Sequence, residues 1–417
     1  MPPQLRLSRV RATNYKAFEA PIELELAPLT IIFGRNGSGK SALTRLPLAL
    51  AEALSGLDSP GLPLQARGIG FGNSLLSFVH GAINGEFSVG ATIQASDGKM
   101  LDLDVVIHKD PKSAARLPGQ WIGRWELRSD GKSIAVFSWN RRDKHYDVEG
   151  VPGTAAPVSF SGLLPLLADR SVHPVVNVLR PTPHVIHLGA SRGIPGEDFV
   201  VQQPNTPLDV GLTGTNTRRV LGSLRSSSHS ELLAAVVDRV RQCFDYDLRV
   251  QDVAQGAVQG TVLEAKPCGR STWLPLSETG TGLAHALPVI VQYVLAAHPS
   301  EDNPPPSTLA CEEPEAHAHP QIQARLADVI LAVGGMDGCR TLIETHSETF
   351  VLRVRRRVAE GLKPESVALY WVDDEQATTC VRRLSVDHQG NVENWPEGWF
   401  DTAMDEVSAI HRAMGHT

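Results

Sequence analysis

The chain has 417 residues, of which 42% are hydrophobic and 20% charged, with a net charge of −7. This length exceeds the usual size of one hydrophobic core, so we expect two lobes or one core with a large insertion. The acidic balance excludes a basic surface over the whole molecule, and any nucleic-acid contact must be a local patch. Two basic groups are candidates, with a solvated face as the simpler interpretation of each: Arg353, Arg355, Arg356 and Arg357, and Arg141, Arg142 and Lys144.

Cysteine spacing and hydrophobic runs indicate the compartment. The five cysteines include no CxxC pair, which argues against a disulfide framework or a zinc ribbon and fits a reducing cytoplasm. The opening MPPQLRLSRVRATNYKAF lacks the apolar core of a signal peptide. No run of 18 or more uncharged apolar residues occurs, so we expect a cytoplasmic protein without a membrane span.

The N-terminal part predicts three strands and a helix. Alternating or apolar runs indicate strands at residues 5–15, 22–27 and 29–34. A helix is expected from Gly39 onward, through SALTRLPLALAEAL. Pro47 would kink this helix or end its first turns, because proline removes a backbone donor.

Residues 85–156 predict a β-rich insertion. EFSVGATIQASDGKMLDLDVVIH alternates apolar and polar residues around Asp97-Gly98, and WIGRWELRSDGKSIAVFSW does so around Asp130-Gly131. An Asp-Gly pair between two alternating runs indicates a hairpin, because the turn needs residues that tolerate positive φ.

The second half predicts helices and strands in turn, followed by a short last helix. Helical spacing or apolar content indicates helices at residues 230–243, 283–297 and 319–333. No heptad array is sustained, which excludes a long coiled coil. Strands are expected within residues 181–193, 307–313, 340–346, 367–374 and 379–387.

GRNGSGKS matches the phosphate-binding pattern G-x-x-x-x-G-K-[ST] in full. It follows an apolar strand and opens a helix, so inward N–H groups and the helix N-terminus would attract phosphate. Lys40 would reach the β- and γ-phosphates, and the Ser41 hydroxyl would ligate Mg²⁺. This motif alone does not choose between kinase, GTPase, motor and switch. The predicted nucleotide-binding residues of this phosphate cradle are Gly34, Arg35, Asn36, Gly37, Ser38, Gly39, Lys40 and Ser41.

Glu312 and Glu313 end a short apolar strand, and in a parallel α/β sheet ligand chemistry lies beyond the carboxyl ends of strands. Consecutive residues there point apart, so we assign Glu312 to the Mg²⁺ shell and Glu313 to the general base. His346 ends another apolar strand, where it is placed to hydrogen-bond the γ-phosphate or the attacking water. The alternatives are an exposed acidic loop and a lone structural histidine.

His317 and His319, in CEEPEAHAHP, raise the alternative of a zinc site. Their spacing can put both on one side of an extended segment. No cysteine or further histidine lies at ligand spacing, however, and the pattern H-E-x-x-H is absent. We therefore expect them, with Glu315, in a loop and helix start whose first turn contains Pro320.

A second glycine-rich segment, LSETGTG at residues 276–282, precedes the apolar helix. Its glycines and the helix N-terminus make another anion site, with Ser277, Gly280, Thr281 and Gly282 as its residues. One cradle already holds the nucleotide in its own subunit. A second anion site in the same chain therefore predicts a composite site, in which two chains sandwich ATP head to tail. The alternative is that the segment is a helix cap after a turn.

Four motifs stand in a recognisable order: GRNGSGKS, LSETGTG, ACEEPEAHAHP and LIETHSE. Together they resemble the ABC-type ATPases of the SMC/Rad50 and OLD-nuclease group, in the bacterial AAA family ATPase branch (AAA_15/AAA_21-like). NYKAFEAPIELELAPLTIIFGRNGSGKS resembles that branch's N-terminal strand and Walker A. DHQGNVENWPEGWFD resembles the DUF3696-like segment that ends one subset of these proteins.

The resemblance implies an α/β fold of the P-loop ABC type, with a mixed sheet, a β-rich insertion and no coiled coil. The ATPase core would comprise residues 1–84, with Walker A, and 157–360, with the signature loop, Walker B and switch histidine. The insertion 85–156 would interrupt it, and a small segment, 361–417, would follow. ATP and Mg²⁺ are the implied cofactors, bound at two shared sites of an ATP-dependent homodimer, with His346 as the switch histidine.

The chain also departs from the group. Ala284-His285 stands where the group has a small polar residue and then Gln, so Ser277 or Thr281 would supply the γ-phosphate contact instead. Gln65 lies in the broad region of a glutamine loop. The 71 residues after His346 (417 − 346) are fewer than a Toprim nuclease domain needs, so we expect no nuclease domain.

The leading hypothesis is an ATP-hydrolysing switch that dimerises on ATP, senses a nucleic-acid structure or a partner, and controls a separately encoded effector. The resemblance implies a role in bacterial anti-phage defence. One alternative is a DNA-repair or chromosome-associated ATPase that itself clamps DNA; DNA or RNA is the candidate nucleic-acid partner. Another is a nucleotide-dependent scaffold or toxin–antitoxin component.

Overall fold

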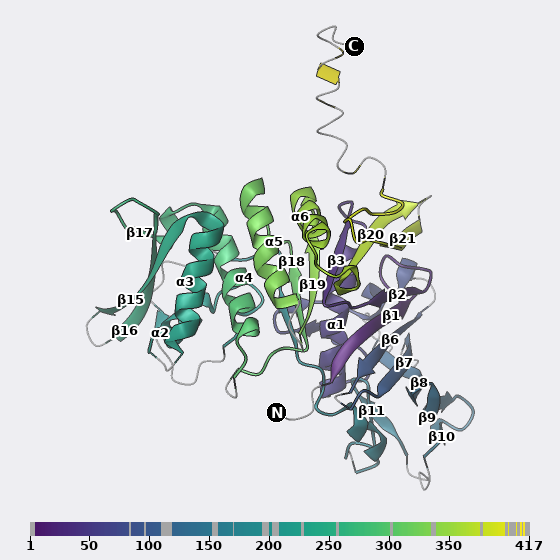
Figure 1. The fold of residues 1–417 in the computed structure, drawn as a ribbon. Coiled ribbons are helices and arrows are strands. Elements are labelled where there is room, and N and C mark those ends of the chain that lie inside the picture. Colours follow the sequence, from purple (N-terminus) through teal and green to yellow (C-terminus); the bar gives the residue numbers. More distant parts are fainter. Residues whose placement is uncertain are drawn as a thin grey trace.

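Two sheets organise the chain, a central sheet of six strands and an antiparallel sheet of seven. The central sheet lies among helices, and the antiparallel sheet lies beside it, on the side of helix α1 (Lys40–Ser55) (Figure 1). The computed structural model describes residues 5–82, 85–95, 97–109, 119–151, 157–169, 171–193, 200–201, 208–226, 229–255, 258–300, 303–334, 339–375, 378–396 and 399, with 406, 409, 410 and 412.

The central sheet has the strand order β13-β18-β19-β3-β20-β21. Its first five strands run parallel, and β21 pairs with β20 antiparallel, so the predicted mixed sheet is confirmed. Parallel strands covered on both faces consist of apolar runs, and every residue of β3 is buried. The bounds are β13 Val185–Leu188, β18 Thr308–Glu312, β19 Arg340–Thr345, β3 Leu29–Gly34, β20 Val367–Glu375 and β21 Thr378–Leu384.

The antiparallel sheet has the order β10-β9-β8-β7-β6-β1-β2. Both predicted hairpins are confirmed, with positive φ at Gly98 and at Asp130-Gly131. These strands do not form a sheet of their own, because β6 pairs with β1 from the N-terminal part. The predicted insertion thus continues a sheet that starts before the cradle. The bounds are β1 Arg6–Thr13, β2 Ile22–Glu25, β6 Glu86–Gln94, β7 Met100–Lys109, β8 Gln120–Ser129, β9 Lys132–Asn140 and β10 His145–Glu149.

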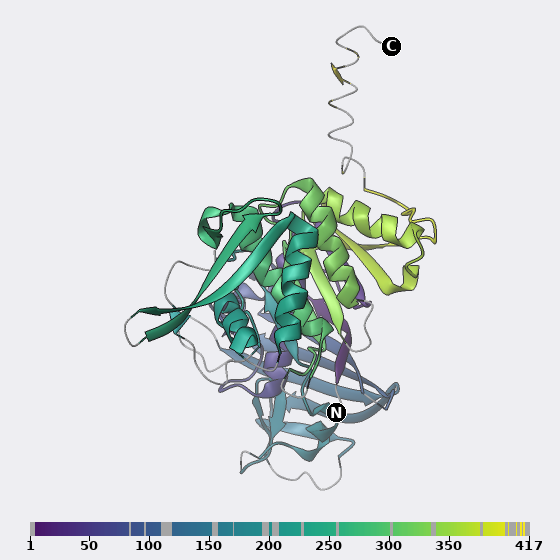
Figure 2. The same cartoon turned by 60° about the vertical axis from the view of Figure 1, so that its left-hand side comes forward.

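Helices cover the two faces of the central sheet. Helix α1 contacts β3, β13, β18 and β19 from one side. On the other side α3, α4, α5 and α6 pack in succession, as two views show (Figures 1 and 2). The bounds are α2 Thr217–Ser226, α3 Ser230–Phe244, α4 Thr281–Ala297, α5 Pro320–Gly334 and α6 Glu348–Ala359.

The central strands separate two hydrophobic cores. Ile32 of β3 packs with α1 and the antiparallel sheet, whereas Ile31 and Phe33 pack with the helices opposite. On β19, Leu342 and Ile343 divide in the same way. Successive side chains of a strand point to opposite faces, so each strand is anchored in both cores. The strand ends that carry the predicted site residues are therefore held firmly.

The sequence prediction missed some elements and misjudged one. Helices α2 and α6 and a long hairpin of β15 (Tyr246–Gln255) and β16 (Val258–Pro267) were not predicted. Pro47 lies buried inside α1, which continues to Ser55, so the expectation that it ends the first turns is wrong. Proline removes one backbone donor, and burial of the helix between the central sheet and the antiparallel sheet stabilises it despite that loss. The short last helix falls mostly outside the described residues.

The remaining elements are short. No helix among the described residues has the length and apolar content to cross a membrane. The short strands are β4 Gln65–Ala66, β5 Ile69–Gly70, β11 Ser159–Ser161, β12 Leu164–Leu166, β14 Val200–Val201 and β17 Leu274–Pro275. The 3₁₀ turns are η1 Leu75–Ser77, η2 His80–Ala82, η3 Pro174–Leu179, η4 Leu276–Glu278 and η5 Pro364–Ser366.

Candidate nucleotide site

The phosphate cradle is the turn between β3 and α1. Gly34, Gly37 and Gly39 have φ of +148°, +81° and +89°, the region that favours glycine. Gly39 precedes the helix in the left-handed conformation, and Lys40 is its first residue. The predicted strand–loop–helix context of the motif is thus confirmed.

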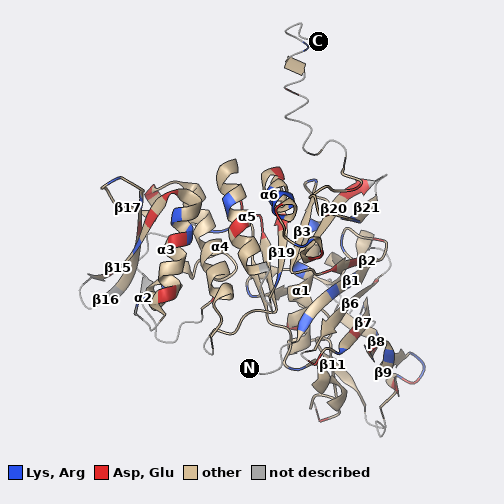
Figure 3. Cartoon of the chain, in the orientation of Figure 1, with Lys and Arg blue, Asp and Glu red and all other residues tan. Residues whose placement is uncertain are grey.

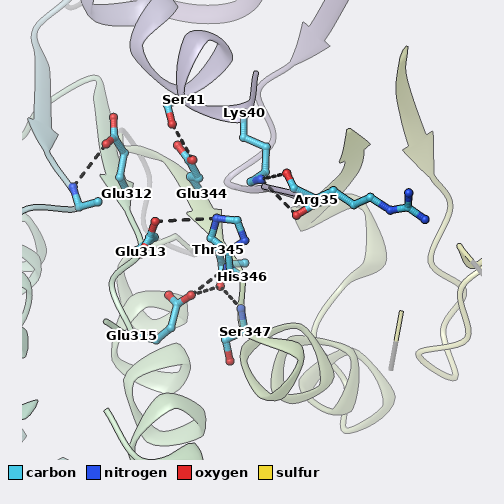
Figure 4. A network of polar contacts seen from close by, with 12 residues as sticks. Arg35, Lys40, Ser41, Glu312, Glu313, Glu315, Glu344, Thr345, His346 and Ser347 are labelled. Atoms are coloured by element: carbon cyan, nitrogen blue, oxygen red, sulfur yellow. Dashed lines mark hydrogen bonds and ion pairs between the residues drawn. The ribbon is translucent and has the colours of Figure 1, made fainter. Parts of the chain in front are cut away.

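Lys40 points back into this loop (Figure 4). Its ammonium donates to the carbonyl of Gly34 at 3.1 Å and to that of Arg35. Burial lowers the pKa of Lys40, while the nearby carboxylates of Glu344 and Glu313 act to raise it. A positive charge is therefore fixed at the mouth of an anion-binding loop.

A cavity of about 490 Å³ opens in front of the cradle. It is lined by Lys40 and Ser41 from the cradle, Glu313 from the turn after β18, and Glu344 and His346 from the end of β19. These segments are far apart in the sequence, and they meet because the parallel strands β3, β18 and β19 end at one edge of the sheet.

Glu344 takes the position next to Ser41. Ser41 Oγ donates to Glu344 Oε1 at 2.7 Å, although the two residues are 303 positions apart. The other oxygen, Oε2, is buried without a hydrogen-bond partner among the described residues. Burial, together with the nearby charge of Glu312, raises the pKa of Glu344 to about 7.

Glu312, the predicted Mg²⁺ ligand, is absent from the described lining of the cavity. Arg45 of α1 donates to both of its oxygens, at 2.5 and 2.8 Å, and His187 Nε2 lies 3.0 Å from Oε1. Burial favours the neutral acid, but hydrogen bonds from Arg45 and His187 outweigh it and hold the pKa of Glu312 at about 2. Both oxygens are thus committed to an internal ion pair, and the carboxylate beside Ser41 is that of Glu344.

Glu313 and His346 face each other across the cavity. His346 Nε2 lies 3.8 Å from Glu313 Oε1, and their side chains are 35% and 38% exposed, so water reaches both. Glu313 has a φ of +43°, which is uncommon for a non-glycine residue, and its N–H donates to the carbonyl of Glu344 at 2.7 Å. Burial and then Lys40 lower the pKa of His346, whereas Glu313 opposes this shift.

Glu315 fixes the segment that carries His346. Its Oε1 accepts from Thr345 Oγ1 at 2.5 Å and from the His346 backbone N–H at 3.0 Å. The neighbouring Ser347 hydroxyl accepts from the N–H of Phe350 and caps α6. Glu315, which the sequence analysis placed in a loop, therefore positions the histidine from beneath (Figure 4).

The LSETGTG segment lies apart from the cradle of its own chain. It forms η4 and the start of α4, and its residues are absent from the lining of the cavity. Gly280 and Thr281 are exposed, and Gly280 has a φ of +100°. Gly282 packs against the carbonyl of His317, where an added Cβ would lie 3.0 Å away. Ser277, Gly280, Thr281 and Gly282 thus do not join the cradle within one chain.

The histidines of the zinc alternative do not converge on a common point. The His317 ring lies 4.4 Å from that of His285 on α4, and His319 precedes α5 with its Nδ1 accepting from the N–H of Gln321. Among the described residues, no group of three or more His, Cys, Asp or Glu side chains is placed to hold a metal ion.

Sequence reasoning missed four residues around the site: Glu344, Arg45, His187 and Arg192. Glu344 carried a usable signal, because it precedes His346 at the end of an apolar strand, as Glu312 does on β18. The two glutamates lie in register on adjacent strands. The basic residues carried no such signal, because they come from segments without a motif.

The residues of the cavity fit a magnesium-bound nucleoside triphosphate. Ser41 and Glu344 offer a hydroxyl and a carboxylate, the hard oxygen donors that Mg²⁺ takes, and Glu344 Oε2 has no other partner among the described residues. Lys40 and the left-handed glycines face the same space and suit phosphate oxygens.

Comparison with known structures returns heads of SMC proteins. A structure of the Smc head bound to the C-winged helix domain of ScpA has 12% identity and a TM-score of 0.49, over 92% of this chain and 98% of that one. The SMC head domain from Thermotoga maritima has 11% identity and a TM-score of 0.42, over 92% of this chain and 99% of that one. A Pyrococcus furiosus Smc head with an extended coiled coil, bound to the C-terminal domain of ScpA, has 11% identity and a TM-score of 0.48. The match covers 98% of this chain and 100% of that one.

Two family models match the sequence, and no curated protein does. Residues 243–351 match the AAA ATPase domain (AAA_15), and residues 362–410 match DUF3696, a protein family of unknown function. The first range contains LSETGTG, Glu312, Glu313 and His346, while the cradle at residues 34–41 rests on its own motif and geometry. The predicted resemblance is confirmed to this extent: one stretch of the chain matches the AAA ATPase domain model, and the stretch after it matches the DUF3696 model.

Proposed function

We propose that the protein binds ATP with Mg²⁺ at the cradle and hydrolyses it. The observation that carries this proposal is the cavity in which Lys40, Ser41, Glu313, Glu344 and His346 meet from three separate strand ends. It combines a phosphate-binding cation, oxygen donors for a metal, and a solvent-accessible carboxylate beside a histidine.

Lys40 and the cradle N–H groups would hold the β- and γ-phosphates, as their position at the helix N-terminus favours. Ser41 and Glu344 would hold Mg²⁺, which when bound neutralises phosphate charge. The earlier assignment of this role to Glu312 has less support, because Arg45 and His187 engage both of its oxygens. Glu312 instead acts as the anchor between α1 and β18.

Glu313 would act as the general base. In the hydrolytic step a water oxygen attacks the γ-phosphorus, its proton passes to the Glu313 carboxylate, and the bond between phosphorus and the leaving oxygen of ADP breaks. His346, 3.8 Å from Glu313, would hydrogen-bond the γ-phosphate or that water. Burial lowers its pKa, which favours the neutral ring.

The site would be completed by a second copy of the chain. Within LSETGTG, Gly280 and Thr281 are exposed at the start of α4, and the segment does not line the cavity of its own chain. A head-to-tail homodimer would bring this helix N-terminus to the γ-phosphate bound in the partner, where its dipole favours negative charge.

The test is Glu313→Gln, which keeps the size of the side chain and removes the base. Turnover is expected to fall by about 10²- to 10⁴-fold while ATP remains bound, because general-base catalysis is lost and the cradle is intact. Turnover is measured by phosphate release and binding by a fluorescent ATP analogue. Glu23→Gln, at an exposed surface ion pair, is the matched control. Turnover that survives in Glu313→Gln would contradict the assignment.

The same variant tests the composite site. Held in its ATP-bound state, Glu313→Gln is expected to have twice the monomer mass by light scattering, and the nucleotide-free protein half of that. Thr281→Trp, which adds bulk at the exposed helix start, should prevent the ATP-dependent dimer without weakening ATP binding to the cradle. A monomer under both conditions would contradict the head-to-tail arrangement.

ATP binding would serve as a switch for a separate effector, in bacterial anti-phage defence as the motif resemblance suggests. The alternative is a clamp on DNA, for which the candidate basic group Arg141, Arg142 and Lys144 is exposed. The arginines of α6 (Figure 3) are engaged internally: Arg353 and Arg357 pair with Asp328, Arg356 pairs with Glu360, and Arg355 lies over the Trp395 ring.

Two measurements separate these roles. ATP turnover that rises with DNA, with an affinity that falls steeply as salt increases, would favour the clamp. Co-purification of a protein encoded beside this one, and phage protection that is lost in Glu313→Gln, would favour the switch.

A further inference from the structure

Arg192 is a buried arginine that lies next to the catalytic turn and belongs to none of the recognised motifs. It follows β13 in the loop LGASRG and is 3% exposed. Its guanidinium donates to four backbone carbonyls: Nη1 to Gly189 at 2.8 Å and Glu312 at 2.8 Å, Nη2 to Glu313 at 2.6 Å, and Nε to His285 at 3.0 Å.

These acceptors belong to three different parts of the site. Gly189 directly follows β13, Glu312 ends β18 and Glu313 follows it, and His285 lies in the first turns of α4. A buried charge is costly unless it is well hydrogen-bonded, so the four bonds lock these segments together. Only the planar, five-donor fork of arginine can serve acceptors in so many directions, and the single ammonium of lysine cannot.

The bond to Glu313 bears on its unusual backbone. The φ of +43° turns the peptide of Glu313 out of the strand, with its N–H bound to the carbonyl of Glu344 and its carbonyl bound to Arg192. Such a conformation persists only when its surroundings fix it. Arg192 and β19 hold the turn from its two sides, and this orients the Glu313 side chain into the cavity.

We propose that Arg192 is a positioning residue that fixes the Glu313 turn and joins it mechanically to α4, the helix that starts at LSETGTG. A partner subunit that moves the start of α4 would thereby act on the base through the Arg192–His285 bond. This inference rests on the proposed ATP hydrolysis and adds to it a route from the dimer contact to the chemistry.

The experiment compares Arg192→Lys and Arg192→Met with wild type. ATP affinity is expected to stay within about 3-fold, because the cradle lies on β3 and α1, while the single-turnover rate falls about 100-fold, as a displacement of the base by about 1 Å can cause. Lysine should rescue little of that rate, since it keeps the charge and loses the fork. Arg67→Met is the matched control, because Arg67 also donates to a β13 carbonyl, that of Val185, away from the turn.

A second measurement separates positioning from a general loss of packing. Ethylguanidinium added to Arg192→Ala should restore part of the single-turnover rate without changing the ATP affinity, and it should not affect Arg67→Ala. A single-turnover rate in Arg192→Lys within about 3-fold of wild type would overturn the inference, as would equal losses of affinity and rate. Wild-type protein that does not hydrolyse ATP would instead overturn the proposed function itself.

Discussion

Glu312 and Glu344 lie directly opposite each other on β18 and β19, yet their electrostatic environments differ. Arg45 and His187 hold the pKa of Glu312 at about 2, and burial beside that charge raises the pKa of Glu344 to about 7. The partners supplied by neighbouring elements, and not the residue type, decide which carboxylate is permanently ionised. The ionised one anchors α1, and the other keeps an oxygen without a partner next to Ser41.

The stability of the nucleotide-free protein is expected to fall as the pH rises from about 5 to 8. The pKa of Glu344 is raised from 4.5 in the unfolded chain to about 7 in the fold, so between these values the folded state binds more protons. The stabilisation is fully present below pH 4.5 and is lost as the pH passes through 7.

Denaturant titrations of wild type and Glu344→Gln, without Mg²⁺ or nucleotide, check this expectation. The free energy of unfolding of the variant should depend less on pH, so that relative to wild type it gains stability toward pH 8. Glu365→Gln, at an exposed site, should follow the wild-type curve. Parallel curves for Glu344→Gln and wild type would rule out the raised pKa.

At the scale of elements, the end of β3 that leads into the cradle is constrained by the neighbouring strand β20. Strand β3 pairs with β19 on one side and β20 on the other, and Gly34, its last residue, lies opposite Val372. A Cβ added at Gly34 would lie 1.9 Å from the Val372 carbonyl oxygen. Glycine is therefore required at Gly34 by the pairing with β20 as well as by the turn.

Gly34→Ala is expected to lower the free energy of unfolding by well over 1 kcal/mol, because its φ of +148° and the Val372 backbone both oppose a side chain. Gly37→Ala is the matched control: its φ of +81° is also unfavourable, but an added Cβ there meets nothing within 4 Å. Urea titrations should show the larger loss at Gly34. Equal losses would mean that the contact with β20 does not constrain the cradle.

At the scale of the whole molecule, the C-terminal segment is part of the body built on the central sheet. Strands β20 and β21, within the DUF3696 match, complete the central sheet beside β3. Beyond them, Trp395 and Trp399 stack on Phe33 with ring centroids 5.8 and 4.4 Å away, and Trp371 meets the same ring at 5.4 Å. Since Phe33 precedes Gly34, the segment caps the strand directly beneath the cradle.

Trp399→Ala should therefore destabilise the protein by about 2 kcal/mol, less than a fully buried tryptophan because Trp399 is partly exposed. Trp273→Ala provides the comparison, since that ring stacks with Arg249 near the β15–β16 hairpin and should have a smaller effect. Denaturant titration gives both values. If the loss at Trp399 is no larger than that at Trp273, the segment is not an anchored cap.

The sequence by itself determined the phosphate cradle, the two Asp-Gly hairpins, most strands of both sheets and the resemblance to AAA ATPase domains, because each depends on a local pattern of glycines, turn residues or apolar period. It also placed Glu313 and His346 at the ends of apolar strands, and both line the cavity in front of Lys40. Their catalytic roles remain predictions.

Only the tertiary structure decided which carboxylate lies beside Ser41, which cation pairs with Glu312, and how the Glu313 turn is held. Glu344, Arg45 and Arg192 act on partners 303, 267 and 121 positions away in the chain. Such pairs are set by sheet register and by the packing of α1 and α4 on the strand ends. Local sequence carries no information about either, because strand order is fixed by burial of the whole sheet between its two cores.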